Sequence, residues 1–182
     1  MVLVLRGNLI ELRLARESEL GVLFELMSNL DTRGPYFPSG VMSGPALRAA
    51  FAKNGFWDHD EGMLLMTTDD GDIVGEIEYF PITHYLQGFE ISYQLFGSQH
   101  AGRGYTTEAV NLLVGYLFGA KRVNRMQLNI HPGNAASKRV AEKSGFTFEG
   151  LMRGCWFHQG QYHDLEIWSL LRDEASNRSK PT

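Results

Sequence analysis

The sequence has a single cysteine among its 182 residues, Cys155. One cysteine cannot form an internal disulfide, which predicts a reducing compartment and therefore a cytoplasmic location. The sequence offers Cys155 no evident histidine partner. We therefore expect this residue to be a small core residue rather than a nucleophile.

Several other absences narrow the class of protein. No apolar run approaches the ~20 residues that a helix needs to cross a bilayer, so no membrane partner is expected. The first residues lack the leading charges and the cleavage site of a signal peptide, so we expect them to enter a first strand. The net charge of −4 argues against a strongly basic surface, and nucleic acid is not an expected partner. The histidines have no ligand spacing, so no metal site is predicted.

The pattern of apolar residues predicts one domain over residues 1–172, followed by a polar tail over residues 173–182. Alternation and helical spacing predict the order β-α-α-β-β-β-α-β-α-β-β. A central hairpin, one βαβ crossover and a terminal ribbon predict a mixed α+β three-layer domain. The strands are expected at residues 8–14, 62–68, 73–80, 89–95 and 123–130, and a closing ribbon at residues 147–153, then 155–158, and 162–171. The helices are expected at residues 17–30, 45–54, 106–119 and 134–144.

The stretch SQHAGRGYTTEAV places Gly102 and Gly104 directly before a predicted helix. A helix N-terminus exposes unpaired N–H groups and partial positive charge, and glycines let the backbone approach an anion closely. The alternative is a plain glycine-rich turn. The stretch has no Gly-Lys-Ser/Thr, and Thr107 stands where a dinucleotide fingerprint needs a third glycine. Both standard nucleotide loops are therefore excluded.

Two motifs together resemble a known family. The pattern Gln99-x-x-Gly102-x-Gly104-Tyr105-x-Thr107-Glu108-Ala109 resembles the acetyl-CoA-binding motif of GCN5-related N-acetyltransferases (GNAT). The later HPGNAASKRVAEKSGFTFEG resembles the second signature of this family, with a spacing typical of its RimJ/RimL-like branch. The resemblance extends over residues 5–171. It implies the GNAT acyl-CoA N-acyltransferase fold, with a central mixed sheet splayed between the strands at residues 89–95 and 123–130.

The resemblance also implies where acetyl-CoA lies as the acyl-donor cosubstrate. Its pantetheine arm is expected in the splay, paired with the strand at residues 89–95 as a peptide pairs with a sheet edge. Its pyrophosphate is expected on the backbone amides of residues 102–106. The expected contacts are Leu95, Phe96, Gly97, Gln99, Gly102, Arg103, Gly104, Tyr105, Thr106, Asn134 and Ser137.

Acyl transfer to an amine requires a neutral amine and a protonated leaving thiolate. Glu90 is the predicted base, because it heads a polar stripe on a strand that the resemblance makes central, where apolar residues are usual. The alternative is a structural carboxylate that pairs with an arginine or faces solvent. Glu76 and Glu78 on the neighbouring strand are further candidates for the base.

Ser137 is the predicted acid for the thiolate, as the resemblance to RimL-like members implies. The tyrosine that has this role in the commoner branch corresponds to Ala141. The alternative for Ser137 is an ordinary serine in the first helical turn, for which Asn134 is the expected N-cap. Five aromatic residues are expected to line the acceptor pocket: Tyr36, Phe37, His84, Tyr85 and Trp156.

Trp156 stands where RimL-like enzymes can carry a second glutamate, and it favours an apolar or ring-bearing amine. For the loop around Tyr36 and Phe37, a packed surface loop is the alternative. For His84, the alternatives are a base and a plain loop histidine.

The function predicted from the sequence is an N-acetyltransferase. It transfers an acetyl group from acetyl-CoA to a primary amine by direct attack in a ternary complex. The acceptor is expected to be a small-molecule amine, an amino acid or a protein N-terminus. One alternative is a non-catalytic CoA-binding or CoA-sensing module. Another is an N-acyltransferase that uses succinyl-CoA or an aminoacyl-tRNA. A homodimer is a further expectation, because the branch often forms dimers.

Overall fold

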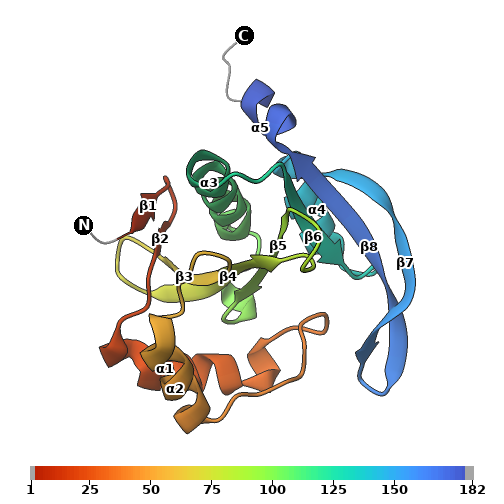
Figure 1. Cartoon of the computed structure of the whole chain (residues 1–182). Helices are drawn as coiled ribbons and strands as arrows, with labels where there is room; N and C mark the ends of the chain where they lie inside the picture. The colour runs from red at the N-terminus through yellow and green to blue at the C-terminus, as the bar shows by residue number, and fades with distance from the viewer. Residues whose placement is uncertain (1–2, 179–182) are drawn as a thin grey trace.

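A single eight-stranded sheet, in the order β1-β2-β3-β4-β5-β6-β8-β7, runs through the molecule (Figure 1). The structure is a computed structural model that describes residues 3–178. All neighbouring strands pair antiparallel except β5 and β6, which are parallel and are joined by the predicted crossover helix. The strands are β1 (Val4–Arg6), β2 (Glu11–Arg13), β3 (Gly62–Thr67), β4 (Ile73–Pro81), β5 (Phe89–Leu95), β6 (Arg125–Ile130), β7 (Thr147–His158) and β8 (Gln161–Leu171).

Helices cover both faces of the sheet, as Figure 1 shows. One face carries α1 and α2, and the other carries α3 and α4. This is the three-layer α+β arrangement expected from the sequence. The helices are α1 (Leu20–Ser28), α2 (Gly44–Asn54), α3 (Tyr105–Ala120), α4 (Ala135–Lys143) and α5 (Arg172–Arg178), with short 3-10 turns at Glu17–Glu19, Leu30–Thr32 and Ser98–His100.

The alternation of β3 shows why both faces are covered. Leu64 and Met66 pack into the larger apolar cluster, which includes Leu113 of α3. Met63 and Leu65 pack into a second cluster with α1 and α2. Because successive strand residues point to opposite faces, an apolar strand of this kind requires cover on both sides.

The sheet opens between β5 and β6. Only two registered pairs join these strands, Phe89 with Met126 and Glu90 with Gln127. Beyond them, β5 continues to Leu95 beside β4, and β6 continues to Ile130 beside β8. The splay that the family resemblance implied is therefore confirmed.

The N-terminal strand differs from its prediction. Residues 8–10 form a turn between β1 and β2 rather than part of one strand. The Glu108 carboxylate of α3 accepts hydrogen bonds from the backbone N–H groups of Asn8, Leu9 and Ile10 at 2.7, 2.8 and 2.9 Å. This contact spans about a hundred residues of sequence, so local alternation could not reveal it.

The C-terminal prediction also needs correction. The segment predicted as a polar tail begins with α5, and the Arg172 guanidinium donates to the backbone carbonyls of Phe118, Lys121 and Val123. The tail residues 179–182 lie outside the described residues. The prediction that Cys155 is a core residue was wrong, because this cysteine is exposed on β7. None of the described helices has the length and apolar character required to span a membrane.

Candidate active site

The turn between β5 and α3 presents backbone donors. Gly97, Gly102 and Gly104 have φ angles of 113°, 74° and 87°, which favour glycine. Gly104 is the N-cap residue of α3, and no side chain of the described residues caps this terminus. The N–H groups of the first helical turn, together with the helix dipole, therefore form a ready anion site.

A cavity of about 980 Å³ extends from this turn into the splay. Nine of the expected acetyl-CoA contacts line it, and Arg139 and Lys143 of α4 add positive charge that the sequence had not indicated. Those nine residues are Leu95, Gly97, Gln99, Gly102, Gly104, Tyr105, Thr106, Asn134 and Ser137.

Two expected contacts are not part of this lining. Phe96 is buried, its N–H donates to the Val74 carbonyl at 2.9 Å, and its own carbonyl accepts from Gln99 Nε2 at 3.4 Å. Both backbone groups of Phe96 are therefore already used within the protein. Arg103 is exposed outside the cavity lining.

Glu90 ends a chain of hydrogen bonds that runs along one face of β6. Arg125 Nη2 donates to Gln127 Oε1 at 3.0 Å, Gln127 Nε2 donates to Asn129 Oδ1 at 3.0 Å, and Asn129 Nδ2 donates to Glu90 Oε2 at 2.7 Å. Every donor points toward Glu90. Arg125 is in turn held by the Glu149 carboxylate at 2.8 and 2.6 Å. Glu90 therefore binds an amide rather than an arginine, and it is half-buried in the cavity wall.

The environment of Glu90 shifts its proton affinity. Burial raises the pKa of this carboxyl, and the hydrogen bond from Asn129 acts in the opposite direction. At the far end of the chain, hydrogen bonds from Arg125 and Ser169 lower the pKa of Glu149 to about 2. Glu149 thus stays ionised beside Arg125, while Glu90 is closer to the range where a carboxylate can accept a proton.

Ser137 lies in the first turn of α4, and Asn134 stands at the start of the same helix. The Asn134 side chain accepts a hydrogen bond from the Ser137 N–H at 3.1 Å, so Asn134 is the N-cap that the sequence predicted. The buried hydroxyl of Tyr93 on β5 lies beside Ser137. Burial raises the pKa of the Tyr93 hydroxyl to about 12, and Ser137 acts in the opposite direction. Ala141, where the commoner branch has its tyrosine, is fully buried.

The two predicted catalytic residues approach the cavity from opposite faces of the sheet. Glu90 is registered with Phe80 on the face that carries α1 and α2. Tyr93, next to Ser137, is three residues further along β5 and so points to the other face. The splay connects these faces, and both Glu90 and Ser137 line its cavity.

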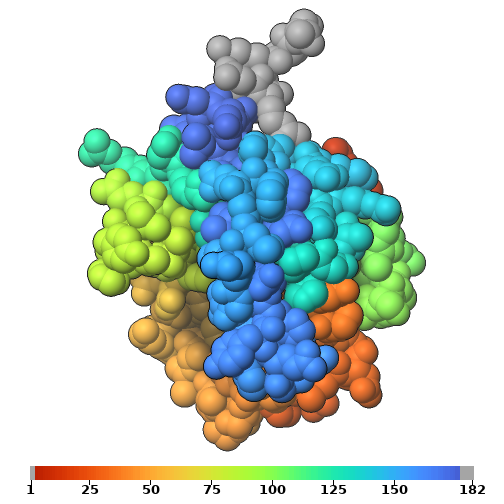
Figure 2. All heavy atoms as spheres, turned by 90° about the vertical axis from the view of Figure 1, so that its right-hand side faces the viewer, coloured from red at the N-terminus to blue at the C-terminus, as the bar shows by residue number. Residues whose placement is uncertain are grey.

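Aromatic and histidine rings form the acceptor end of the cavity. Tyr36 stacks on His131 with ring centroids 4.8 Å apart, and Trp156 stacks on His158 at 4.3 Å. His158 Nε2 lies 3.0 Å from the Pro35 carbonyl, so the β7–β8 ribbon is fastened to the loop after α1. Figure 2 shows the tip of this ribbon beside the orange segments of that region. Tyr36, Phe37 and Trp156 line the cavity, as does His131, which the sequence reasoning did not single out.

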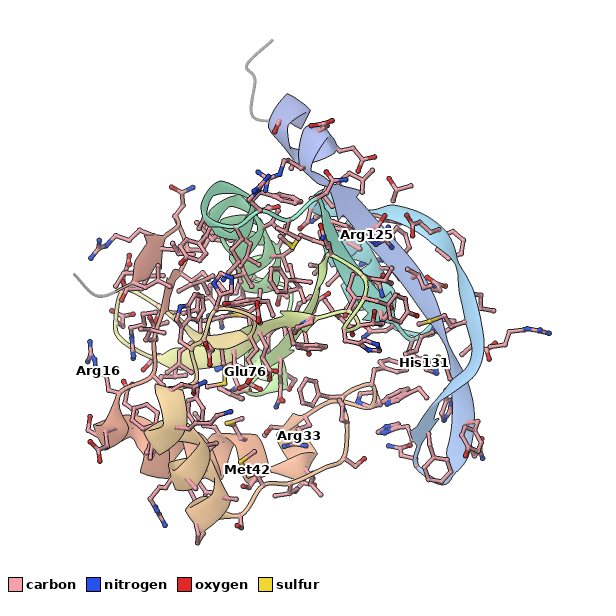
Figure 3. All side chains as sticks on the ribbon, in the orientation of Figure 1. Arg16, Arg33, Met42, Glu76, Arg125 and His131 are labelled. Carbon is pink, nitrogen blue, oxygen red and sulfur yellow. The ribbon has the colours of Figure 1, made fainter. Side chains whose placement is uncertain are left out.

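His131 follows β6 and begins the second family signature. Burial and the neighbouring His163 and His158 lower its pKa, which keeps its imidazole neutral. Figure 3 shows Arg125 and His131 toward opposite ends of β6. The other two expected acceptor residues, His84 and Tyr85, pack on each other edge to face at 5.1 Å and are absent from the cavity lining.

Glu76 and Glu78, the other candidates for the base, share the face of Glu90 but line a smaller cavity. Burial and the charge of Glu78 raise the pKa of Glu76 to about 8. Burial likewise raises the pKa of Glu78. Among residues 3–178, no cluster of three or more His, Cys, Asp or Glu side chains could hold a metal ion.

A splayed mixed sheet, with a glycine turn and an uncapped helix N-terminus beside the splay, defines the class of acyl-CoA N-acyltransferase folds. The family model described as "Acetyltransferase (GNAT) domain" matches residues 10–147. This range covers more than half of the chain, so the protein belongs to the GNAT acetyltransferase family.

Individual relatives agree with this assignment. The chain is 33% identical over 118 residues to "Probable N-acetyltransferase YjcK" of Bacillus subtilis strain 168, a match that covers 64% of this chain and 65% of that protein. It is 21% identical over 169 residues to spermidine N(1)-acetyltransferase of Vibrio cholerae, covering 93% and 96%. The match to YjcK thus spans less than two thirds of that relative.

A solved structure shows the same fold. The crystal structure of spermidine N-acetyltransferase from Vibrio cholerae in complex with CoA and spermine superposes with a TM-score of 0.80 at 20% identity. The superposition covers 94% of this chain and 100% of that chain.

Proposed function

We propose that this protein is an acetyl-CoA-dependent N-acetyltransferase that acetylates a primary amine by direct attack in a ternary complex. The observation that carries this proposal is the cavity in the splay between β5 and β6. It joins the uncapped N-terminus of α3 to Glu90 and Ser137, which lie on opposite faces of the sheet.

The donor side of the cavity fits acetyl-CoA. Gly102 has open space where a Cβ would stand, and a Cβ on Gly104 would lie 3.1 Å from Leu9 Cδ1. The glycine turn therefore leaves its backbone N–H groups accessible to a pyrophosphate. Along the splay, the edge of β5 past Glu90 has no β6 partner and can pair with an extended arm. When bound, acetyl-CoA supplies the activated thioester.

The acceptor nitrogen must lose a proton before it can attack. A free alkylamine has a pKa near ~10 and is mostly protonated at neutral pH. Glu90 is placed to take this proton, directly or through one water, because burial raises its pKa and Asn129 fixes one of its oxygens. On the other face, the Ser137 hydroxyl is placed to donate a proton to the leaving sulfur, with Tyr93 as its neighbour.

We infer that the acceptor is a small-molecule amine. Tyr36, Phe37, His131 and Trp156 enclose the acceptor end with rings, which suits a compact ligand. The fastening of the β7–β8 ribbon to Pro35 narrows the same end. The relative from Vibrio cholerae, named for spermidine, supports this acceptor class. The expected cytoplasmic location rests on the single cysteine.

The test is a thiol-release assay with acetyl-CoA and a panel of alkylamines, amino acids, polyamines, aminoglycosides and peptides. We expect at least one small amine to release CoA thiol in equal amount to the acetylated product identified by mass spectrometry. The variant Glu90→Gln is expected to lower kcat about 100-fold while acetyl-CoA still binds. Tight CoA binding without thiol release for any amine would contradict catalysis and favour a binding module. Faster release from succinyl-CoA would overturn the choice of donor.

A further inference from the structure

A polar stripe on β4 and β5 extends from Glu90 beneath α1 and α2. Glu78 is registered with Ser92, and Glu76 with Gln94, so these four side chains share the face of Glu90. Glu76 and Gln94 have exposed fractions of only 2% and 4%. Carboxylates and amides this deeply buried normally have protein partners.

Several polar atoms of this stripe have no hydrogen-bond partner. Glu76 Oε2 and both the Oε1 and Nε2 atoms of Gln94 are buried without a hydrogen-bond partner among the described residues. No ion pair joins a described basic side chain to either Glu76 or Glu78. Burial of unpaired polar groups is unfavourable. Their concentration on one stripe points to a ligand that would complete their hydrogen bonds.

Arg33 lines the same cavity as Glu76 and Glu78, but its Nη groups are bound to backbone carbonyls. Its guanidinium donates to the backbone carbonyls of Pro38 and Gly40 at 2.7 and 2.6 Å and also to the Met27 carbonyl. Arg33 therefore stabilises its own loop and forms no ion pair with Glu76, although its charge lowers the pKa of that carboxyl and its Nε has no hydrogen-bond partner among the described residues. Figure 3 shows Glu76 on the sheet and Arg33 and Met42 on the helical side of the same region.

A cavity of about 170 Å³ lies between these layers. Its walls are mainly apolar and include the rings of Phe24 and Phe37, while Glu76 and Glu78 supply its carboxylates. Carboxylates combined with aromatic faces are suited to an ammonium group. The smaller cavity shares Arg33, Phe37 and Pro38 with the larger one, so the two spaces adjoin.

We propose that the stripe binds a second ammonium group of the acceptor, so that the preferred substrate is a diamine rather than a monoamine. This inference rests on the proposed amine acetylation. One amino group is near Glu90, and the other lies between Glu76, Glu78 and Gln94. An ammonium group has three N–H donors, which match carboxyl oxygens of Glu76 and Glu78 and Gln94 Oε1. Its positive charge lowers the pKa of a neighbouring carboxyl, so Glu76 is expected to release its proton when the ammonium binds.

Strand geometry sets the length of this substrate. Ser92 is two residues beyond Glu90 and opposite Glu78, which puts the Cα atoms of Glu90 and Glu78 roughly 8 Å apart. Glu76 is two residues further along β4, roughly 14 Å from Glu90. A diamine of the length of putrescine or cadaverine is therefore expected to bridge the site better than ethylenediamine.

The experiment compares matched acceptors in the thiol-release assay: cadaverine, pentylamine and aminopentanol, which differ only in the group at the far end. We expect kcat/KM for cadaverine to exceed that for the other two by about tenfold or more. Glu76→Gln and Glu78→Gln should each reduce this ratio. Glu25→Gln makes the same substitution on the exposed side of α1, outside the cavity, and should leave the ratio intact.

The outcomes separate the two proposals. Equal kcat/KM values for the three acceptors in the unaltered protein would overturn the second-ammonium site but leave the acetyltransferase proposal standing. If no amine releases thiol, the proposed function fails, and calorimetric binding of cadaverine and pentylamine to the unaltered protein still decides the inference. Binding of cadaverine no tighter than that of pentylamine would overturn it, whether or not the glutamine variants fold.

Discussion

The Asn129 side-chain amide donates a 2.7 Å hydrogen bond to Glu90 Oε2 while its own oxygen accepts one from Gln127. This double contact fixes the orientation of the amide. The orientation of Gln127 is in turn set by its hydrogen bond from Arg125. Arg125 therefore polarises a chain of two neutral amides that ends in a donor to Glu90.

Replacement of Asn129 by alanine should therefore alter the base rather than the fold. The lost hydrogen bond is one that lowers the pKa of Glu90, so its removal raises that pKa further. We expect the acidic limb of the kcat/KM profile to move to higher pH and kcat to fall about tenfold. The matched control is Asn111→Ala on the exposed side of α3. Identical pH profiles for both variants would remove Asn129 from the site.

Ser137→Ala should separate turnover from binding. The hydroxyl is proposed to protonate the leaving thiolate, whereas the backbone contact with Asn134 does not require it. We expect kcat to fall about tenfold or more, with the dissociation constant of acetyl-CoA nearly unchanged in calorimetry. An equal loss of affinity and turnover would instead assign Ser137 to cofactor binding.

Gly104→Val should abolish binding of acetyl-CoA. Gly104 has a φ of 87°, so an added side chain strains this turn, and its Cβ would lie only 3.1 Å from Leu9 Cδ1. Both effects are expected to displace the α3 amides that would bind the pyrophosphate. Gly55→Val is the matched control, because Gly55 has a φ of 67° and open space around it at the end of α2. If Gly104→Val bound acetyl-CoA as tightly as the control does in calorimetry, the anion site would be excluded.

Glu76 predicts a specific dependence of stability on pH. Its folded pKa of about 8 lies above the ordinary value of 4.5, so between these pH values the folded protein holds a proton that the unfolded chain releases. Its contribution to stability is therefore present below about pH 4.5 and is lost as the pH rises to about 8. Glu78 reinforces the shift, and Arg33 opposes it.

We expect the Tm, measured by differential scanning calorimetry, to fall as the pH rises from 4.5 to about 8, because Glu76 loses its stabilising effect over this range. Glu76→Gln should flatten that part of the curve. Equal slopes in the two proteins would show that Glu76 titrates normally.

The sequence predicted the parts of the fold that depend on local pattern. The hairpin between β3 and β4, the crossover from β5 through α3 to β6, and the N-cap Asn134 are short-range features that appear as predicted. The turn at residues 8–10 and the docking of Arg172 depend on distant partners, so no local pattern could reveal them.

The same distinction holds for the site. The glycine turn was visible because it is contiguous in sequence. The chain of hydrogen bonds from Arg125 to Glu90 was not recognised in the sequence. Its residues Arg125, Gln127 and Asn129 alternate with apolar Met126, Leu128 and Ile130, and this alternation could have been read as a polar face. The acceptor end required the fold, because His158 meets Pro35 across more than a hundred residues.

The opening between β5 and β6 also has a mechanical consequence. Within the described residues, two registered pairs are all that unite the strands β1 to β5 with the strands β6 to β8 in one sheet. The proposed acetyl-CoA site thus lies where the two halves of the sheet separate, and a ligand that pairs with β5 and also contacts α4 beyond β6 would connect the two halves. Occupancy and resistance to unfolding should therefore rise together, and the empty protein is expected to flex along this line first.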